Sequence, residues 1–161
     1  MRDFPSLSEW AAHLERVVER HEATAARVLT VSAKAVVLRS KEKIGHYQPQ
    51  EGIVPAWSPL AESTLAEKRR LGFTGRRSAD DPLLRTGELM ESYGFGLALW
   101  SASSTLQGWQ AHIGSPLDVA LWQELGTAKM PPRPVISGAT AEEASLFAAA
   151  VGAAFFGLWK V

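Results

Sequence analysis

Cysteine is absent from the 161-residue sequence. Its absence excludes disulfide bonds, thiol nucleophiles and thiolate metal sites, and it fits a protein made in a reducing cytoplasm. A net charge is lacking too, because 17 lysines and arginines balance 17 aspartates and glutamates. A neutral chain sets up no overall field that attracts nucleic acid or an anionic membrane, so any electrostatic partner has to meet a local patch. The length allows one domain with its own core, and we predict a single domain over residues 1–161.

Signatures of catalysis and of metal binding are also missing. No Gly-x-Ser-x-Gly elbow surrounds a serine, and the pair Gly94 and Gly96 lies in a strand pattern rather than in a phosphate-binding turn. The histidines show neither i, i+4 pairing nor a carboxylate at ligand spacing; they are His13, His21, His46 and His112. Because metal sites need closely placed donors, we expect no metal, no cofactor and no enzymatic activity.

Long apolar runs are few. The first eight residues lack the apolar core of a signal peptide, so we do not expect secretion. The most apolar stretch, from Ala144 to Trp159, approaches the length of a membrane span but carries Ser145 and two glycines. We interpret it as a buried or interface helix and expect no membrane partner.

The first third of the chain predicts one long helix. From about Ser8 to Lys43 there is no glycine or proline, and a stripe of residues recurs at steps of four and three: Trp10, Leu14, Val17, His21, Thr24, Val28, Val31, Ala35 and Leu38. Pro5 ahead of Ser6 and Ser8 supplies start signals and Gly45 a stop, so we predict a helix over 8–44, about 50 Å long. The His, Thr and Ala in the stripe disfavour a two-stranded coiled coil. We expect this surface to be shared between the chain's own sheet and a neighbouring subunit.

Residues 45–82 are rich in proline and glycine and predict a loop region. One short helix is predicted inside it, from Leu60 to Leu71, with Ser58 as its N-cap, Pro59 at its first position and Gly72 as its stop. The stretch 73–81 offers little to bury and is predicted to be a mobile loop.

Residues 83–137 predict the sheet. A short helix from Leu83 to Tyr93, capped by Thr86, precedes two alternating strands, Tyr93 to Ser101 and Thr105 to Ile113, which we expect to form an antiparallel hairpin. A further short helix, Pro116 to Leu125, follows.

The end of the chain predicts a stop, an extended segment and a final helix. Gly126 ends the preceding helix, and Pro131, Pro132 and Pro134 hold the chain extended. Thr140 and Glu143 form a capping box that is predicted to open a C-terminal helix within 138–161. The predicted fold class is therefore α+β, with a long N-terminal helix and a C-terminal helix packed on a small antiparallel sheet.

Three segments carry a resemblance to a known family. The first runs from Trp57-Ser58-Pro59-Leu60-Ala61 on to Thr64 and Lys68. The second, 83–93, contains Thr86-Gly87-Glu88-Leu89-Met90-Glu91-Ser92 and is similar to a "TG-x-L-x-x-S" signature. The third, 120–134, contains Glu124-Leu125-Gly126-Thr127 and Met130-Pro131-Pro132-Arg133-Pro134, similar to an "EfGT-x-x-MPaRP" signature. In this order they resemble the neck, head-to-tail joining and tail-completion proteins of tailed bacteriophages (virion morphogenesis type). Val135-Ile136 departs from that pattern, where Phe-Leu is commoner.

The resemblance implies a structural virion protein that forms a homo-oligomeric ring, six- or twelve-fold, at the head-tail junction. Its partners would be other copies of itself, a head connector or adaptor, tail tube or terminator proteins, and packaged double-stranded DNA in the lumen. It would reside in the virion, and in the host cytoplasm during assembly. Related families share the third signature, so neck and tail completion both stay open. The alternatives are a tail-terminator-like subunit and a sequence-independent DNA-binding module.

Two sets of residues are candidate sites. The interface set is Trp122, Glu124, Gly126, Thr127, Met130, Pro131, Arg133 and Pro134. Gly126 and the prolines would present Met130 and Arg133 on a stiff edge, with Arg133 paired either to Glu124 or to an acid of the next subunit. The other interpretation is that this segment only joins a helix to a strand.

The second set is a basic cluster for phosphate contacts in a DNA-filled lumen: Lys68, Arg69, Arg70, Arg76 and Arg77. A solvated loop or a contact to an acidic neighbour is the alternative, since four acidic residues lie close in sequence. Among the tryptophans, we expect Trp10, Trp109 and Trp122 in the core. Trp57, Trp100 and Trp159 are candidates for contact surfaces, although burial is the safer prediction for each.

Overall fold

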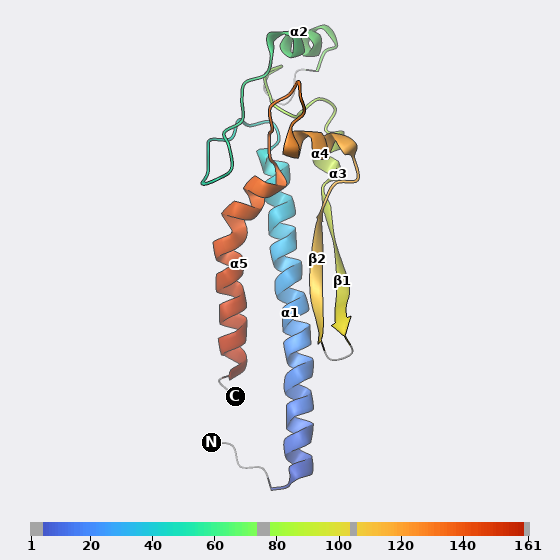
Figure 1. The fold of residues 1–161 in the computed structure, drawn as a ribbon, viewed down its shortest axis with the longest axis vertical. Helices are drawn as coiled ribbons and strands as arrows, with labels where there is room; N and C mark the ends of the chain where they lie inside the picture. Colours follow the sequence, from blue (N-terminus) through green and yellow to red (C-terminus); the bar gives the residue numbers. More distant parts are fainter. Residues whose placement is uncertain (1–4, 74–77, 104–105, 160–161) are drawn as a thin grey trace.

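The computed structural model describes residues 5–73, 78–103 and 106–159. Its longest element is the helix α1 (Leu7–Lys43), which runs from the bottom of the molecule up to the level of α4, below α2 (Figure 1). The Ser6 hydroxyl caps it by accepting the Glu9 N–H at 3.2 Å, and the chain leaves it at Gly45, whose φ is +93°. The predicted helix over 8–44 is confirmed to within one residue at each end.

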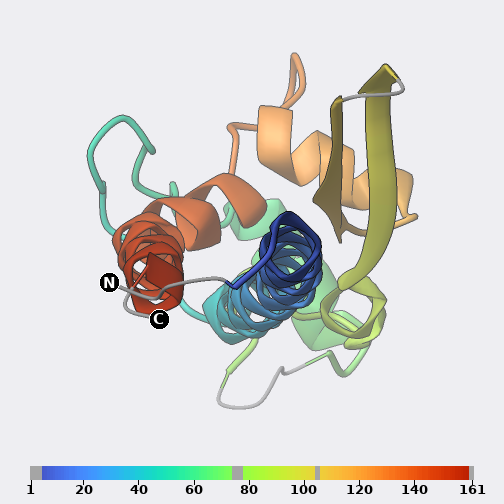
Figure 2. The same cartoon turned by 90° about the horizontal axis from the view of Figure 1, so that it is seen from below.

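Two elements pack along α1. Helix α5 (Ile136–Trp159) runs beside it in the opposite direction, and the hairpin of β1 (Gly94–Ser103) and β2 (Leu106–Gly114) lies on another side. Seen from below, α1 stands between α5 and the hairpin (Figure 2). The strands pair antiparallel, with Phe95 opposite Ile113 and Leu97 opposite Ala111. The α+β class with two terminal helices and a small antiparallel sheet is as predicted.

The remaining elements form a head at the C-terminal end of α1 (Figure 1). They are α2 (Glu62–Arg70), α3 (Glu88–Ser92), α4 (Asp118–Leu125) and the loops that join them. The main core cluster lies here: Ile44, Trp57, Leu84, Tyr93, Ala120 and Val135. The head is therefore the part of the molecule in which distant segments are fixed together.

Two predicted helix starts in the head are wrong. Helix α2 begins at Glu62 with Ala61 as its N-cap, because the carbonyls of Ser58 and Pro59 are bound by the Arg133 side chain instead of entering a helix. Helix α3 covers only Glu88–Ser92 rather than 83–93, because Leu83 and Gly87 both have positive φ, a conformation that does not continue an α-helix.

The predicted start of the last helix is also wrong. Helix α5 begins at Ile136, so Thr140 lies inside it and forms no capping box. Glu143, the expected partner in that box, binds Arg39 of α1 at 3.1 Å. The cap comes from a residue elsewhere in the chain, described below.

The expected roles of the tryptophans are partly reversed. Trp57, a candidate for a contact surface, is 4% exposed and belongs to the core, which was the safer prediction for it. Trp10 and Trp122, predicted in the core, are exposed, because no element covers their faces of α1 and α4, and Trp109 is half-buried. The side chains of Trp100 and Trp159 lie outside the described residues.

Candidate assembly site in the head

The carboxylate of Glu124, at the end of α4, caps the start of α5. It accepts the N–H groups of Val135 at 2.7 Å, Ile136 at 3.1 Å and Ser137 at 2.7 Å. The first N–H groups of a helix have no partner inside the helix, and a negative charge there is stabilised by the helix dipole. One side chain from α4 thus fixes where α5 begins.

Arg133 joins the same segment to the loop before α2. Its side chain is buried, with 5% of the residue exposed, and its Nη2 donates to the carbonyls of Ser58 at 3.0 Å and Pro59 at 3.2 Å. Its backbone N–H donates to the Gln123 carbonyl at 2.6 Å. Burial lowers the pKa of Arg133, yet a guanidinium stays charged at all ordinary pH values. Of the two acidic partners considered for Arg133, Glu124 of the same subunit is not its partner, because each side chain binds backbone groups instead.

The turn between these two side chains is rigid. Gly126 ends α4 with φ +75° and ψ 178°, a region that is essentially restricted to glycine. A Cβ at this position would lie 2.9 Å from the Pro132 nitrogen. Thr127 and Met130 then exchange two backbone hydrogen bonds, at 2.8 and 3.2 Å. The predicted stop at Gly126 is confirmed, and residues 131–134 lie outside any helix or strand.

Three residues of the predicted interface set therefore make their contacts within their own subunit. Arg133, Pro134 and the carboxylate of Glu124 join α4, α5 and the loop before α2 within one subunit. The segment thus has an internal joining role, but it links two helices rather than a helix to a strand. Trp122, Thr127 and Pro131 are exposed, and Met130 is half-buried. Only these outward residues are free to meet a neighbour.

An apolar face on α4 lies directly before this turn. Leu121, Trp122 and Leu125 are 58%, 52% and 71% exposed. Leu121 and Leu125 were not among the predicted interface residues; their only signal was that they are large apolar side chains beside the motif, on a helix that buries Ala120. Contiguous apolar patches of this kind mark binding surfaces.

The three motif segments meet at one groove of about 560 Å³. Its walls come from α2 and the residues before it, from the turn 83–89, and from α4 with the loop 129–131. Four cationic and two acidic side chains line it: Lys68, Arg85, Lys129, Arg133, Glu67 and Glu88. This convergence was not predicted, since each segment lies in a different part of the chain.

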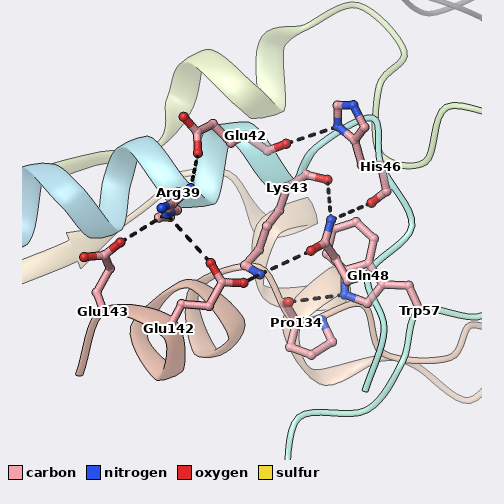
Figure 3. A network of polar contacts seen from close by, with 9 residues as sticks. All are labelled: Arg39, Glu42, Lys43, His46, Gln48, Trp57, Pro134, Glu142 and Glu143. Carbon is pink, nitrogen blue, oxygen red and sulfur yellow. Dashed lines mark hydrogen bonds and ion pairs between the residues drawn. The ribbon is translucent and has the colours of Figure 1, made fainter. Parts of the chain in front are cut away.

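A polar network holds the head to the two long helices (Figure 3). The buried Lys43 ammonium binds Glu142 of α5 and, at 3.2 Å, the side-chain oxygen of Gln48. Arg39 reaches Glu143 of α5 at 3.1 Å. The Trp57 indole N–H donates to the Pro134 carbonyl at 3.3 Å. Polar contacts thus link the C-terminal end of α1, the first turns of α5 and the loop 48–57. They hold the head in a fixed position on the two long helices.

The basic cluster is dispersed. Lys68 is buried, its ammonium donates to the Asp81 carbonyl at 2.7 Å, and burial lowers its pKa. Arg69 pairs with Glu62 at 3.3 Å, while Arg70 is exposed. Arg76 and Arg77 lie outside the described residues. Lys68 therefore serves the fold, and the described part of the cluster gives little basis for a phosphate-binding surface.

Comparisons with known proteins give no relative. No family model matches the sequence, no curated protein matches it, and no solved structure matches the chain. Within residues 5–73, 78–103 and 106–159, no helix is both long and apolar enough to span a membrane. In the same part of the chain, no three histidine or acidic side chains are grouped as metal ligands would be.

Proposed function

We propose that the chain is a structural virion protein of a tailed bacteriophage, a subunit of a homo-oligomeric ring at the head-tail junction. The proposal starts from the resemblance of the three motif segments to neck and tail-completion proteins. The ring would lie either in the neck or at the tail-completion position. A tail-terminator-like subunit, which stops growth of the tail tube, is the alternative among structural virion proteins. The proposed role depends on shape and burial rather than on chemistry.

The observation that carries the proposal is the apolar face of α4 beside a rigid turn. Leu121, Trp122 and Leu125 remain open in the single chain, although together they resemble the centre of a protein interface, in which tryptophan is a frequent anchor. The internal bonds of Glu124 and Arg133 hold this face in place before any partner arrives. A surface that is ordered in advance loses little conformational entropy on docking.

The exposed stripe on α1 supports the same role. Leu7, Trp10, Leu14 and Val18 recur at steps of three and four and are exposed. The N-terminal part of α1, dark blue in Figure 1, extends beyond α5 and the hairpin. A helix that projects from its own fold with an apolar stripe needs a neighbour to cover it.

The DNA-binding module is the weaker alternative. Lys68 is buried and Arg69 is paired with Glu62, so two of the five basic residues are engaged within the chain. Non-specific DNA binding depends on free cations that release counterions from phosphates. Strongly salt-dependent binding of duplex DNA by the purified chain would favour that alternative.

The test is a complementation experiment in the phage that encodes the chain. Deleting the gene should leave DNA-filled heads and separate tails, and the wild-type chain should restore joined particles that carry it at the junction. Trp122→Asp should fold but fail to restore joining, because it places a charge in the interface. Ala23→Asp, on an exposed position of α1 away from the head, is the matched control. Incorporation into the capsid shell, or normal particles without the chain, would refute the proposal.

A further inference from the structure

The loop 48–57 presents one aliphatic side chain entirely to solvent. Ile53 is 101% exposed, so none of the residues that the structure describes covers it. The turn that carries it is held by two backbone hydrogen bonds between Glu51 and Val54, at 3.0 and 2.9 Å. At the base of the loop, the Trp57 N–H donates to the Gln48 carbonyl at 2.9 Å. The loop is thus a stiff projection with an isoleucine at its tip.

The groove of about 560 Å³ is a site that such a tip can fill. Apolar residues from all three walls line it, among them Leu60, Leu71, Leu83, Leu89 and Met130. The volume lies in the range of natural binding pockets. Burying an exposed isoleucine in an apolar pocket is favourable because it removes apolar surface from water.

The charges of the two surfaces are complementary. Glu51 is the only charged residue of the loop 48–57. Around the groove, Lys68 and Arg133 bind carbonyls of their own subunit and Glu67 pairs with Arg85. Lys129 is then the exposed cation of the groove and Glu88 its exposed acid, on a different wall. Neither Glu51 nor Lys129 forms an ion pair with any residue that the structure describes. A Glu51 that arrives with Ile53 therefore finds a free partner of opposite charge.

The loop cannot reach the groove of its own subunit. In Figures 1 and 2 the loop 48–57 projects from the head on the side of α5, whereas α3 and α4 lie on the side of the hairpin. No residue between Gln48 and Trp57 lines the groove. An apolar projection and a pocket on different sides of one molecule form a heterologous contact, which closes into a ring when the rotation allows it.

We propose that the Ile53 tip of each subunit inserts into the head groove of the next copy, with Glu51 facing Lys129. This inference deepens the proposed ring by naming one contact that builds it. The contact uses both surfaces in every subunit, so it repeats around a closed ring without an unfilled pocket. Both sides are preformed, and insertion requires no rearrangement of the loop.

Disulfide trapping tests the contact on the purified full-length chain, because the sequence has no cysteine of its own. One preparation carries only Ile53→Cys, and a second carries only Thr64→Cys or Glu88→Cys, two exposed positions on different walls of the groove. The two preparations are mixed at high concentration under mild oxidation. We expect mixed dimers to form much faster than when Ile53→Cys is replaced by Ala23→Cys, and a chain with cysteines at 53 and 64 should give a ladder of covalent oligomers.

A second measurement separates the contact from the fold. Ile53→Asp should unfold at the same temperature as the wild type, since no residue that the structure describes covers the side chain, yet weaken self-association or incorporation into particles at least tenfold. Ile53→Leu should keep both. Glu51→Lys should weaken association, and Glu51→Lys combined with Lys129→Glu should restore it.

The contact is refuted if mixed dimers form no faster than in the Ala23→Cys control, or if Ile53→Asp assembles like the wild type. Failure of the proposed function is a different result. Trapping between positions 53 and 64 in a chain that is absent from the head-tail junction would retain the contact and reject the phage role.

Discussion

Removal of the Glu124 carboxylate should detach the start of α5 from α4. In Glu124→Ala, the N–H groups of Val135, Ile136 and Ser137 lose their shared acceptor. Loss of an ordinary N-cap costs about 1 kcal/mol. Hydrogen bonds to a charged group contribute about 1.5–3 kcal/mol, and the helix dipole adds up to about 1 kcal/mol. Because water replaces part of these interactions at this half-buried site, we expect the free energy of unfolding to fall by about 3 kcal/mol.

Equilibrium unfolding in urea measures this loss. With a denaturant slope of about 1–3 kcal/mol per molar, the midpoint should fall by roughly 1–3 M. Glu124→Gln keeps one acceptor oxygen but loses the charge, so its loss should be about half as large. Hydrogen exchange should show faster exchange of the amides of Val135, Ile136 and Ser137, because these donors no longer have a protein acceptor.

The matched control is Glu22→Ala. Glu22 is an exposed glutamate on α1, far from the head, and its removal should change the free energy of unfolding by less than about 0.5 kcal/mol. If Glu124→Ala and Glu22→Ala unfold at the same urea concentration, or if the three amides stay protected, the capping argument is wrong.

Three further substitutions probe the same region. Gly126→Ala should lower the free energy of unfolding by about 3 kcal/mol in urea titrations, because its Cβ would meet the Pro132 nitrogen at 2.9 Å in a glycine-restricted conformation. Arg133→Lys should cost about 1–2 kcal/mol by the same assay, because an ammonium cannot reproduce the guanidinium fork on two carbonyls; equal stability would contradict that role. Tyr93→Phe should raise the thermal midpoint and stability by about 1 kcal/mol at neutral pH, because the buried hydroxyl has no hydrogen-bond partner among the described residues. Burial raises the pKa of Tyr93 above its ordinary 10.0, so wild-type stability should fall as pH rises above 10 and Tyr93→Phe should lose less of it.

The elements that follow from local patterns were predictable. The stripe on α1 repeats over many turns without glycine or proline, so a long helix was the one solution that placed it on a single side. The alternation in β1 and its close partner β2 needed only a short connection. Gly126 ended α4 because the residue itself permits a backbone that others avoid.

The helix starts in the head were not predictable, because distant residues decide them. Ser58 and Pro59 form a good local start signal, but Arg133, 75 residues away from Ser58, binds their carbonyls. Glu124, rather than a capping box at Thr140, caps the start of α5, and Glu143 forms an ion pair with Arg39. A local motif competes with every side chain that the fold brings near it, and those neighbours are not visible in a sequence window.

The candidate site was predicted only in part, because local motifs are visible in the sequence and contacts between distant segments are not. The motif around Gly126 was recognised as a rigid segment, but its carboxylate and guanidinium were expected to face each other or a neighbour. The groove forms only where three separate segments meet, and the sequence of one segment does not show that the other two lie beside it. The exposed Ile53 had no periodicity to mark it, since it lies in a tight turn.

The distribution of burial along α1 has an evolutionary consequence. Its buried residues, Ala33, Val36, Ser40 and Lys43, all lie in the last third of the helix, next to the head. Substitutions nearer the N-terminus of α1 therefore change the surface that α1 exposes to other molecules, with little loss of folding free energy. The sequence of α1 can therefore change together with that of a binding partner while the sequence of the head is kept. Sequence differences between related chains should concentrate in the first two dozen residues of α1.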